Sequence, residues 1–73
     1  MSKSIGTKEY SNFVKKLKEA RLNTGLRQID VSKKLKRHQS YISKIESGEQ
    51  RVDVTELNKL AKIYKKDINY FIK

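Results

Sequence analysis

The sequence predicts a small all-α domain, and three observations lead to that fold class. Apolar residues recur at spacings of three and four along most of the chain, which is the period of an amphipathic helix. Proline is absent, and two of the three glycines directly follow segments with this period, where a left-handed helix cap favours glycine. With 73 residues, the chain is long enough for one hydrophobic core and too short for two.

The first expected helix starts at Tyr10, with a tail over residues 1–9 and a folded core over residues 10–72. Its apolar face consists of Tyr10, Phe13, Val14, Leu17 and Ala20. Gly25 ends this helix, and a shorter one is expected up to Leu35. A polar break of Lys36, Arg37 and His38 then leads to a third helix over residues 39–47, which Gly48 ends.

Two more helices complete the predicted bundle. Asp53 followed by Glu56 is a variant of the capping box and predicts a fourth helix. The apolar face of that helix consists of Val54, Leu57, Leu60, Ala61 and Tyr64. Asp67 can cap a short last helix that carries Phe71 and Ile72 on one side. The expectation is a compact bundle of five helices in a single domain over residues 1–73.

Charge is the strongest compositional signal. Eighteen Lys and Arg against eight Asp and Glu give a formal net charge of +10. This excess suits a polyanionic partner, either nucleic acid or an anionic membrane surface, although a merely solvated lysine-rich surface would look the same. No segment approaches the ~20 apolar residues of a membrane span, and "MSKSIGTKEY" has no apolar signal-peptide core. A cytoplasmic location is therefore expected.

The sequence argues against a metal site, a cofactor and an enzyme. It contains no cysteine and one histidine, His38, so neither a disulfide nor a zinc site can be built. It has no glycine-rich phosphate loop, and no serine or carboxylate is evidently placed to work with His38. A membrane-active cationic peptide is also disfavoured, because the charges are spread over five helices with narrow apolar stripes.

The third expected helix, within "HQSYISKIESG", has two unlike faces. At about 100° per residue, one side carries Gln39, Ser40, Ser43, Lys44 and Ser47. These side chains can hydrogen-bond to base edges: Gln matches adenine, Ser serves as donor or acceptor, and Lys reaches guanine or a phosphate. An ordinary solvated helix is the alternative interpretation.

The opposite side of this helix is apolar except for one carboxylate. It carries Tyr41, Ile42, Ile45 and Glu46. A carboxylate at the edge of an apolar arc needs a cationic partner or contact with water. Arg21 is one candidate partner, and direct exposure of Glu46 to water is the alternative.

Taken together, these residues resemble the Cro/CI-type (Xre) helix-turn-helix domain of phage repressors and bacterial regulators. The resemblance runs from about Phe13 to Ile72. Its most specific elements are Gly25-Leu26 followed by Gln28, then Val31, Ser32 and Leu35, then "QSYISKIESG" and "TELNKLAKIY". It implies a lambda-repressor-like five-helix fold in which residues 28–35 and 39–47 are the two helices of the motif.

The resemblance also implies roles for individual residues. It implies a buried ion pair between Arg21 and Glu46. The base-reading residues that it implies are Gln39, Ser40 and Lys44, with Tyr41 and Ser43 as additions. The implied phosphate contacts are Gln28, Lys36, Arg37 and Arg51. The chain departs from the family at Lys36 and Lys65, where glycine is usual, so these turns either avoid positive φ or are strained.

The function that follows is a sequence-specific double-stranded DNA-binding transcriptional regulator, a repressor or autoregulator. It would act as a homodimer on a pseudo-palindromic operator, with Tyr70, Phe71 and Ile72 as the dimer contact. Two alternatives share the fold: an antitoxin with a toxin partner, and the controller protein of a restriction–modification operon.

Overall fold

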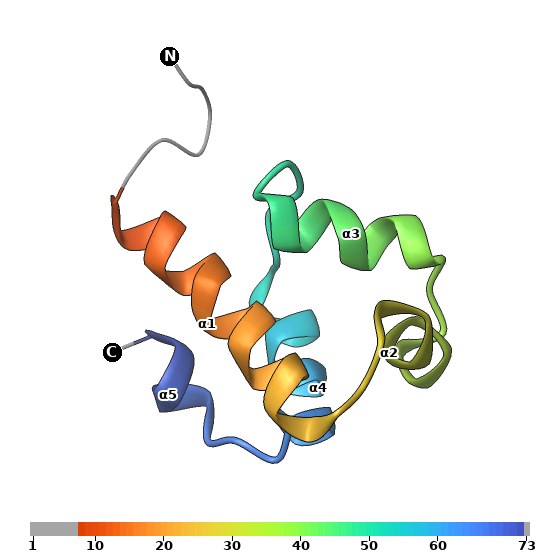
Figure 1. The fold of residues 1–73 in the computed structure, drawn as a ribbon. Helices are drawn as coiled ribbons and strands as arrows, with labels where there is room; N and C mark the ends of the chain where they lie inside the picture. The colour runs from red at the N-terminus through yellow and green to blue at the C-terminus, as the bar shows by residue number, and fades with distance from the viewer. Residues whose placement is uncertain (1–7, 73) are drawn as a thin grey trace.

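Five helices connected by short turns make up the part of the chain described by the computed structural model, residues 8–72 (Figure 1). They are α1 (Lys8–Thr24), α2 (Gln28–Leu35), α3 (Gln39–Ser47), α4 (Val54–Ile63) and α5 (Ile68–Ile72). No strand occurs in this range, so the predicted all-α fold is confirmed. Helix α1 begins two residues earlier than expected, which leaves Lys8 and Glu9 in the helix. The rest of the predicted tail, residues 1–7, lies outside the described residues.

The first four helices end in the same way, with one residue in the left-handed conformation. These residues are Gly25 (φ 77°), Lys36 (φ 61°), Gly48 (φ 85°) and Lys65 (φ 58°). After each helix, two successive backbone N–H groups donate back to carbonyls of the last turn, a Schellman arrangement that satisfies otherwise unpaired carbonyls. Lys36 and Lys65 therefore do adopt positive φ, which is less favourable for a residue with a Cβ by roughly 1–2 kcal/mol.

The helix starts differ from one another. The carboxylate of Asp53 accepts a hydrogen bond from the Glu56 backbone N–H at 2.8 Å, so the predicted cap of α4 is confirmed. Asp67 likewise accepts from the Asn69 N–H at 2.8 Å, at the start of α5. His38 occupies the position before α3, and its side chain makes no capping hydrogen bond.

The core draws on every helix. Its buried apolar side chains are Leu17, Ala20, Val31, Leu35, Ile42, Ile45, Leu57, Leu60, Ala61, Tyr64 and Phe71. Ser32 is also buried, and its hydroxyl donates to the Ile29 carbonyl at 2.8 Å. Helix α3 packs against both α1 and α2, so one of its sides is covered and the other points away from the bundle (Figure 1).

Burial corrects one expectation about the C-terminus. Phe71 is only 2% exposed and belongs to the core, because the short α5 turns it inward against α1 and α4. Its side chain therefore offers very little exposed surface for a dimer contact. Its neighbours differ: Tyr70 is half-buried and Ile72 is 62% exposed.

Candidate nucleic-acid interface

The outward side of α3 is polar and exposed. Its exposed side chains are Gln39, Ser40, Ser43, Lys44 and Ser47. On the inward side, Ile42 and Ile45 are 1% and 2% exposed. The tertiary structure thus separates the polar and apolar sides of this helix, and the polar side is free to contact a ligand.

Tyr41 does not belong to that polar side, although it was among the candidate base-reading residues. Its side chain is half-buried and packs against the core. Burial raises the pKa of the Tyr41 hydroxyl above its usual value. The ring also lies under the guanidinium of Arg37, so Tyr41 is better placed to hold Arg37 than to contact a base.

Arg21 and Glu46 form a buried ion pair that connects α1 to α3. The Arg21 Nε donates to Glu46 Oε2 at 2.6 Å, and Nη2 donates to Oε1 at 3.0 Å. The side chains are 9% and 5% exposed. The hydrogen bond to Glu46 raises the pKa of the Arg21 guanidinium, against the opposing effect of burial. This geometry excludes the alternative in which Glu46 simply points into water.

The ion pair extends to the start of α2. The amide nitrogen of Gln28 donates to Glu46 Oε1 at 3.1 Å, and Arg21 Nη1 donates to the Leu26 carbonyl at 3.0 Å. One carboxylate thus connects three helices and fixes the orientation of α3. The sequence pattern did not indicate this bond of Gln28. A phosphate contact by Gln28 stays a prediction, and it would have to use another atom of the side chain or the backbone.

Arg37, in the turn before α3, is bound on two sides. Its Nη2 donates to Glu56 Oε2 at 3.0 Å, and its guanidinium carbon lies 4.4 Å from the centroid of the Tyr41 ring. Its side chain is 46% exposed, whereas that of Glu56 is only 11% exposed. The hydrogen bond to Glu56 raises the pKa of Arg37. The sequence pattern did not identify Glu56 as the partner of Arg37, because the capping box already gave Glu56 a role at the start of α4.

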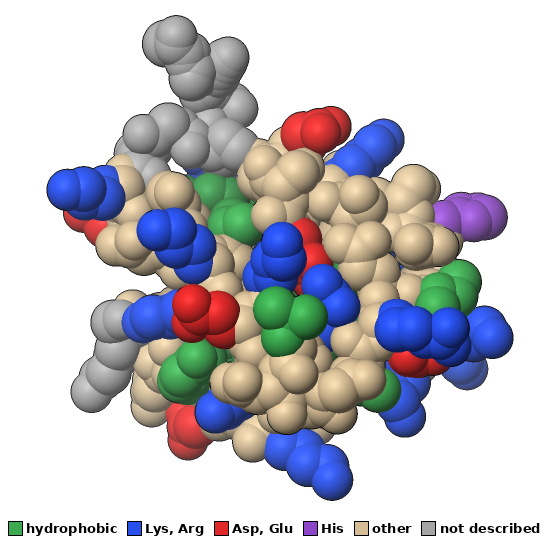
Figure 2. All heavy atoms as spheres, in the orientation of Figure 1, with side chains coloured by type: hydrophobic (Ala, Val, Ile, Leu, Met, Phe, Trp, Pro, Cys, Tyr) green, Lys and Arg blue, Asp and Glu red, His purple; other side chains and the backbone are tan. Residues whose placement is uncertain are grey.

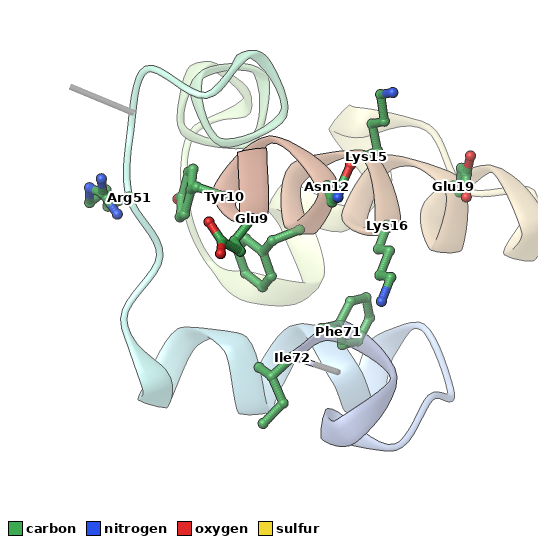
Figure 3. A pocket seen from close by; sticks show the side chains of 10 residues that line it. Glu9, Tyr10, Asn12, Lys15, Lys16, Glu19, Arg51, Phe71 and Ile72 are labelled. Atoms are coloured by element: carbon green, nitrogen blue, oxygen red, sulfur yellow. The ribbon is translucent and has the colours of Figure 1, made fainter. Parts of the chain in front are cut away.

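Arg51 lies in the loop that follows α3, next to the beginning of α1 (Figure 3). Its guanidinium carbon is 4.5 Å from the centroid of the Tyr10 ring. Tyr10 in turn packs on Phe13, with ring centroids 5.3 Å apart. Lys36, the remaining predicted phosphate contact, is exposed in the turn between α2 and α3.

Three further features of the surface lie outside α3: the surroundings of Tyr70, a groove between α1 and α5, and the spread of charged side chains. Tyr70 has the ammonium groups of Lys16 and Lys66 at 5.8 and 4.6 Å from its ring centroid. A groove of about 650 Å³ runs between α1 and α5, with Phe13, Phe71 and Ile72 among the residues that line it (Figure 3). Lys and Arg side chains spread over the face drawn in Figure 2, with scattered acids among them.

Two further observations concern residues 8–72 as a whole. None of the helices in residues 8–72 is long and apolar enough to cross a membrane. Within the same range, no three His, Cys, Asp or Glu side chains come together as potential metal ligands.

Comparison with known proteins agrees with this geometry. A family model described as helix-turn-helix matches residues 17–71, which spans α2, the turn and α3 together with most of the packing around them. No curated protein matches the chain. The match covers far more than half of the sequence, and the helices occur where the motif requires them. The chain belongs to the Cro/CI-type helix-turn-helix family of DNA-binding proteins.

Proposed function

We propose that the protein is a sequence-specific transcriptional regulator, a repressor or autoregulator, that binds double-stranded DNA through α3. The observation that carries this proposal is the outward side of α3, where Gln39, Ser40, Ser43 and Lys44 are exposed together and none is acidic. An ordinary solvated helix would instead favour pairs of opposite charge four residues apart.

In the proposed complex, α3 lies in the major groove. Gln39 at its N-terminus donates to and accepts from an adenine edge, Ser40 and Ser43 add single hydrogen bonds, and Lys44 contacts a guanine or a phosphate. Gln28, Lys36, Arg37 and Arg51 contact the DNA backbone and set the position of α3. The Arg21–Glu46 pair supports this proposal because it holds α3 in one orientation.

The proposed active form is a homodimer. Two copies of α3 would enter successive major grooves about 34 Å apart on a pseudo-palindromic site. The exposed Ile72 and the half-buried Tyr70, next to the groove between α1 and α5, support a contact through this end of the molecule. Binding to DNA also suggests a cytoplasmic, nucleoid-associated location.

The experiment that tests this function is selection of duplex DNA from a random pool at ~150 mM salt, where screening reduces non-specific binding. Enrichment of a palindrome with half-sites about one helical turn apart would support a dimeric regulator and identify its operator. A pool that stays unenriched, with binding that disappears as salt rises, would contradict specific recognition by the protein alone. In that case an antitoxin, which needs a toxin partner, becomes the better hypothesis.

A further inference from the structure

The two arginines that flank α3 make the same kind of contact with a tyrosine ring. Arg37 comes just before the helix and Arg51 just after it, so they lie at opposite ends of the candidate reading surface. Each guanidinium lies over a tyrosine ring, Arg37 over Tyr41 at 4.4 Å and Arg51 over Tyr10 at 4.5 Å. A guanidinium stacked on an aromatic ring is attracted by the ring quadrupole and loses part of its freedom.

The Arg37 side chain is held by a hydrogen bond to Glu56 in addition to its stack on Tyr41. Glu56 is 8% exposed, and its Oε1 atom is buried without a hydrogen-bond partner among the described residues. Its other oxygen accepts from Arg37. If Arg37 moved away, a buried carboxylate would lose this cation, which is strongly unfavourable. Arg37 therefore has to contact any ligand from its present position, with the N–H groups that point away from Glu56.

The Arg51 side chain contacts α1 through its stack on Tyr10. Tyr10 lies in the first turns of that helix and packs on Phe13, which in turn contacts the core. The stack thus connects the loop after α3 to the beginning of α1, as Figure 3 shows. Arg51 itself lies on the exposed loop between α3 and α4.

We propose that Tyr41 and Tyr10 are positioning residues that hold Arg37 and Arg51 ready to contact the DNA backbone at the two ends of α3, with Glu56 as a third positioning residue for Arg37. This inference rests on the proposed function, because it assumes that α3 enters the groove. Stacking occupies the flat face of a guanidinium and leaves N–H groups at its edge, which are the ones that donate to phosphate.

The benefit of this arrangement is a smaller loss of freedom on binding. A mobile arginine that becomes ordered in a complex weakens the affinity, and a side chain that is already ordered avoids that loss. The tyrosines therefore strengthen binding to DNA of any sequence without contacting it. They should not change which base pairs are preferred, because phosphate contacts carry no direct sequence information.

The test measures affinity for a random-sequence duplex of about 30 base pairs, roughly three helical turns, at ~50 mM salt. Tyr41→Leu and Tyr10→Leu should each weaken binding by about 2- to 10-fold, whereas Tyr41→Phe and Tyr10→Phe, which keep the ring, should bind like the original protein. The salt dependence should stay the same, because the number of phosphate contacts does not change. Circular dichroism verifies that each variant is folded.

Substitution of each arginine by lysine keeps a cation in place, beside Glu56 in the case of Arg37, and circular dichroism again verifies folding. Arg37→Lys and Arg51→Lys keep the net charge but lose the planar stack, so each should weaken binding by about 2- to 10-fold. Arg27→Lys is the matched control, since Arg27 is an exposed arginine that pairs with Asp30 on α2. The loss from Arg37→Lys should largely disappear in a Tyr41→Leu background, because the two residues act as a unit.

Glu56→Gln adds a test that depends on whether the affinity for DNA rises or falls. Removal of a negative charge strengthens DNA binding in general, and Glu49→Gln, at an exposed position after α3, should do so slightly. If Glu56 positions Arg37, Glu56→Gln should instead weaken binding despite the same change in charge. Stronger binding by Glu56→Gln, or Leu variants that bind as well as Phe variants, would overturn the positioning role. No binding of the random duplex by the unaltered protein would overturn the proposed function itself.

Discussion

Arg21 and Glu46, which are 25 residues apart in sequence, meet through two parallel hydrogen bonds of 2.6 and 3.0 Å. This fork-to-fork geometry is the strongest form of an arginine–carboxylate pair. Its place between α1 and α3 means that the orientation of the candidate reading helix depends on a pair that is itself buried.

The first prediction concerns this pair. Glu46→Ala leaves Arg21 buried without its carboxylate, so the free energy of unfolding should fall by roughly 3–5 kcal/mol in urea titrations. The double substitution Arg21→Met with Glu46→Leu removes both charges and should cost much less, because apolar pairs often replace buried ion pairs without loss. A loss below ~1 kcal/mol for the single variant would contradict a structural role.

The second prediction concerns base reading by Gln39. Gln39→Ala should reduce discrimination at one base pair by about 1–3 kcal/mol, because the two hydrogen bonds to an adenine edge are lost. Affinity for random duplexes should hardly change. The control is Asn58→Ala, at an exposed position of α4. An unchanged preferred sequence after selection with Gln39→Ala would show that α3 is not the reader.

The third prediction compares two strained turns. Lys36→Gly and Lys65→Gly relieve positive φ values of 61° and 58°, so each should raise the free energy of unfolding by up to about 1 kcal/mol. Only Lys36→Gly should also weaken DNA binding, since Lys65 lies after α4, away from α3. Gly25→Ala is the reverse control: nothing lies within 4 Å of an added Cβ, so any loss reflects φ alone.

The fourth prediction separates the core from the dimer contact at the C-terminus. Phe71→Ala should lower the free energy of unfolding by about 3–5 kcal/mol, since the ring is buried. Ile72→Glu should leave the stability of the monomer within ~0.5 kcal/mol, because this side chain is exposed. It should nevertheless shift a dimer toward monomer in sedimentation experiments. An unchanged oligomeric state would exclude Ile72 from the interface.

The fifth prediction concerns Asp30 in α2. The side-chain hydrogen bond from Arg27 and the Arg27 backbone N–H hold the pKa of the Asp30 carboxyl at about 2, below its ordinary 3.8. A depressed pKa means that the stabilisation is present above pH 3.8 and is lost as the pH falls toward 2. Carboxyl NMR titration should give this low value, and Arg27→Ala should return it toward 3.8. An identical pKa in both proteins would contradict this pairing.

Much of the fold could be predicted because it depends on neighbours in sequence. The period of the apolar residues predicted the helices, and Gly25 and Gly48 indicated where two of them end. Asp53 indicated the start of α4, through a hydrogen bond to a residue only three positions away. The start of α1 was placed two residues late, because the polar Lys8 and Glu9 add nothing to an apolar pattern. The two faces of α3 also followed from helical geometry alone.

The partners of the charged side chains could not be predicted in this way. The sequence pattern left two possibilities for the Glu46 carboxylate, a pair with Arg21 or exposure to water. It did not indicate that Gln28 would also donate a hydrogen bond to Glu46. Arg37 pairs with Glu56, which belongs to a different helix. The Tyr41 ring lies under Arg37, although the helical period of α3 does not indicate which residue Tyr41 contacts. Such contacts depend on how helices pack, which no local pattern encodes.

By itself, then, the sequence determined the five helices, the polar side of α3 and the positive charge, since each depends on local spacing or on composition. Only the tertiary structure decided that Phe71 is core while Ile72 is exposed, that the turns at Lys36 and Lys65 take positive φ, and that tyrosines lie under the flanking arginines. The physical reason is that burial, turn geometry and stacking depend on how segments distant in sequence pack together, and a small, closely packed core has room for few arrangements.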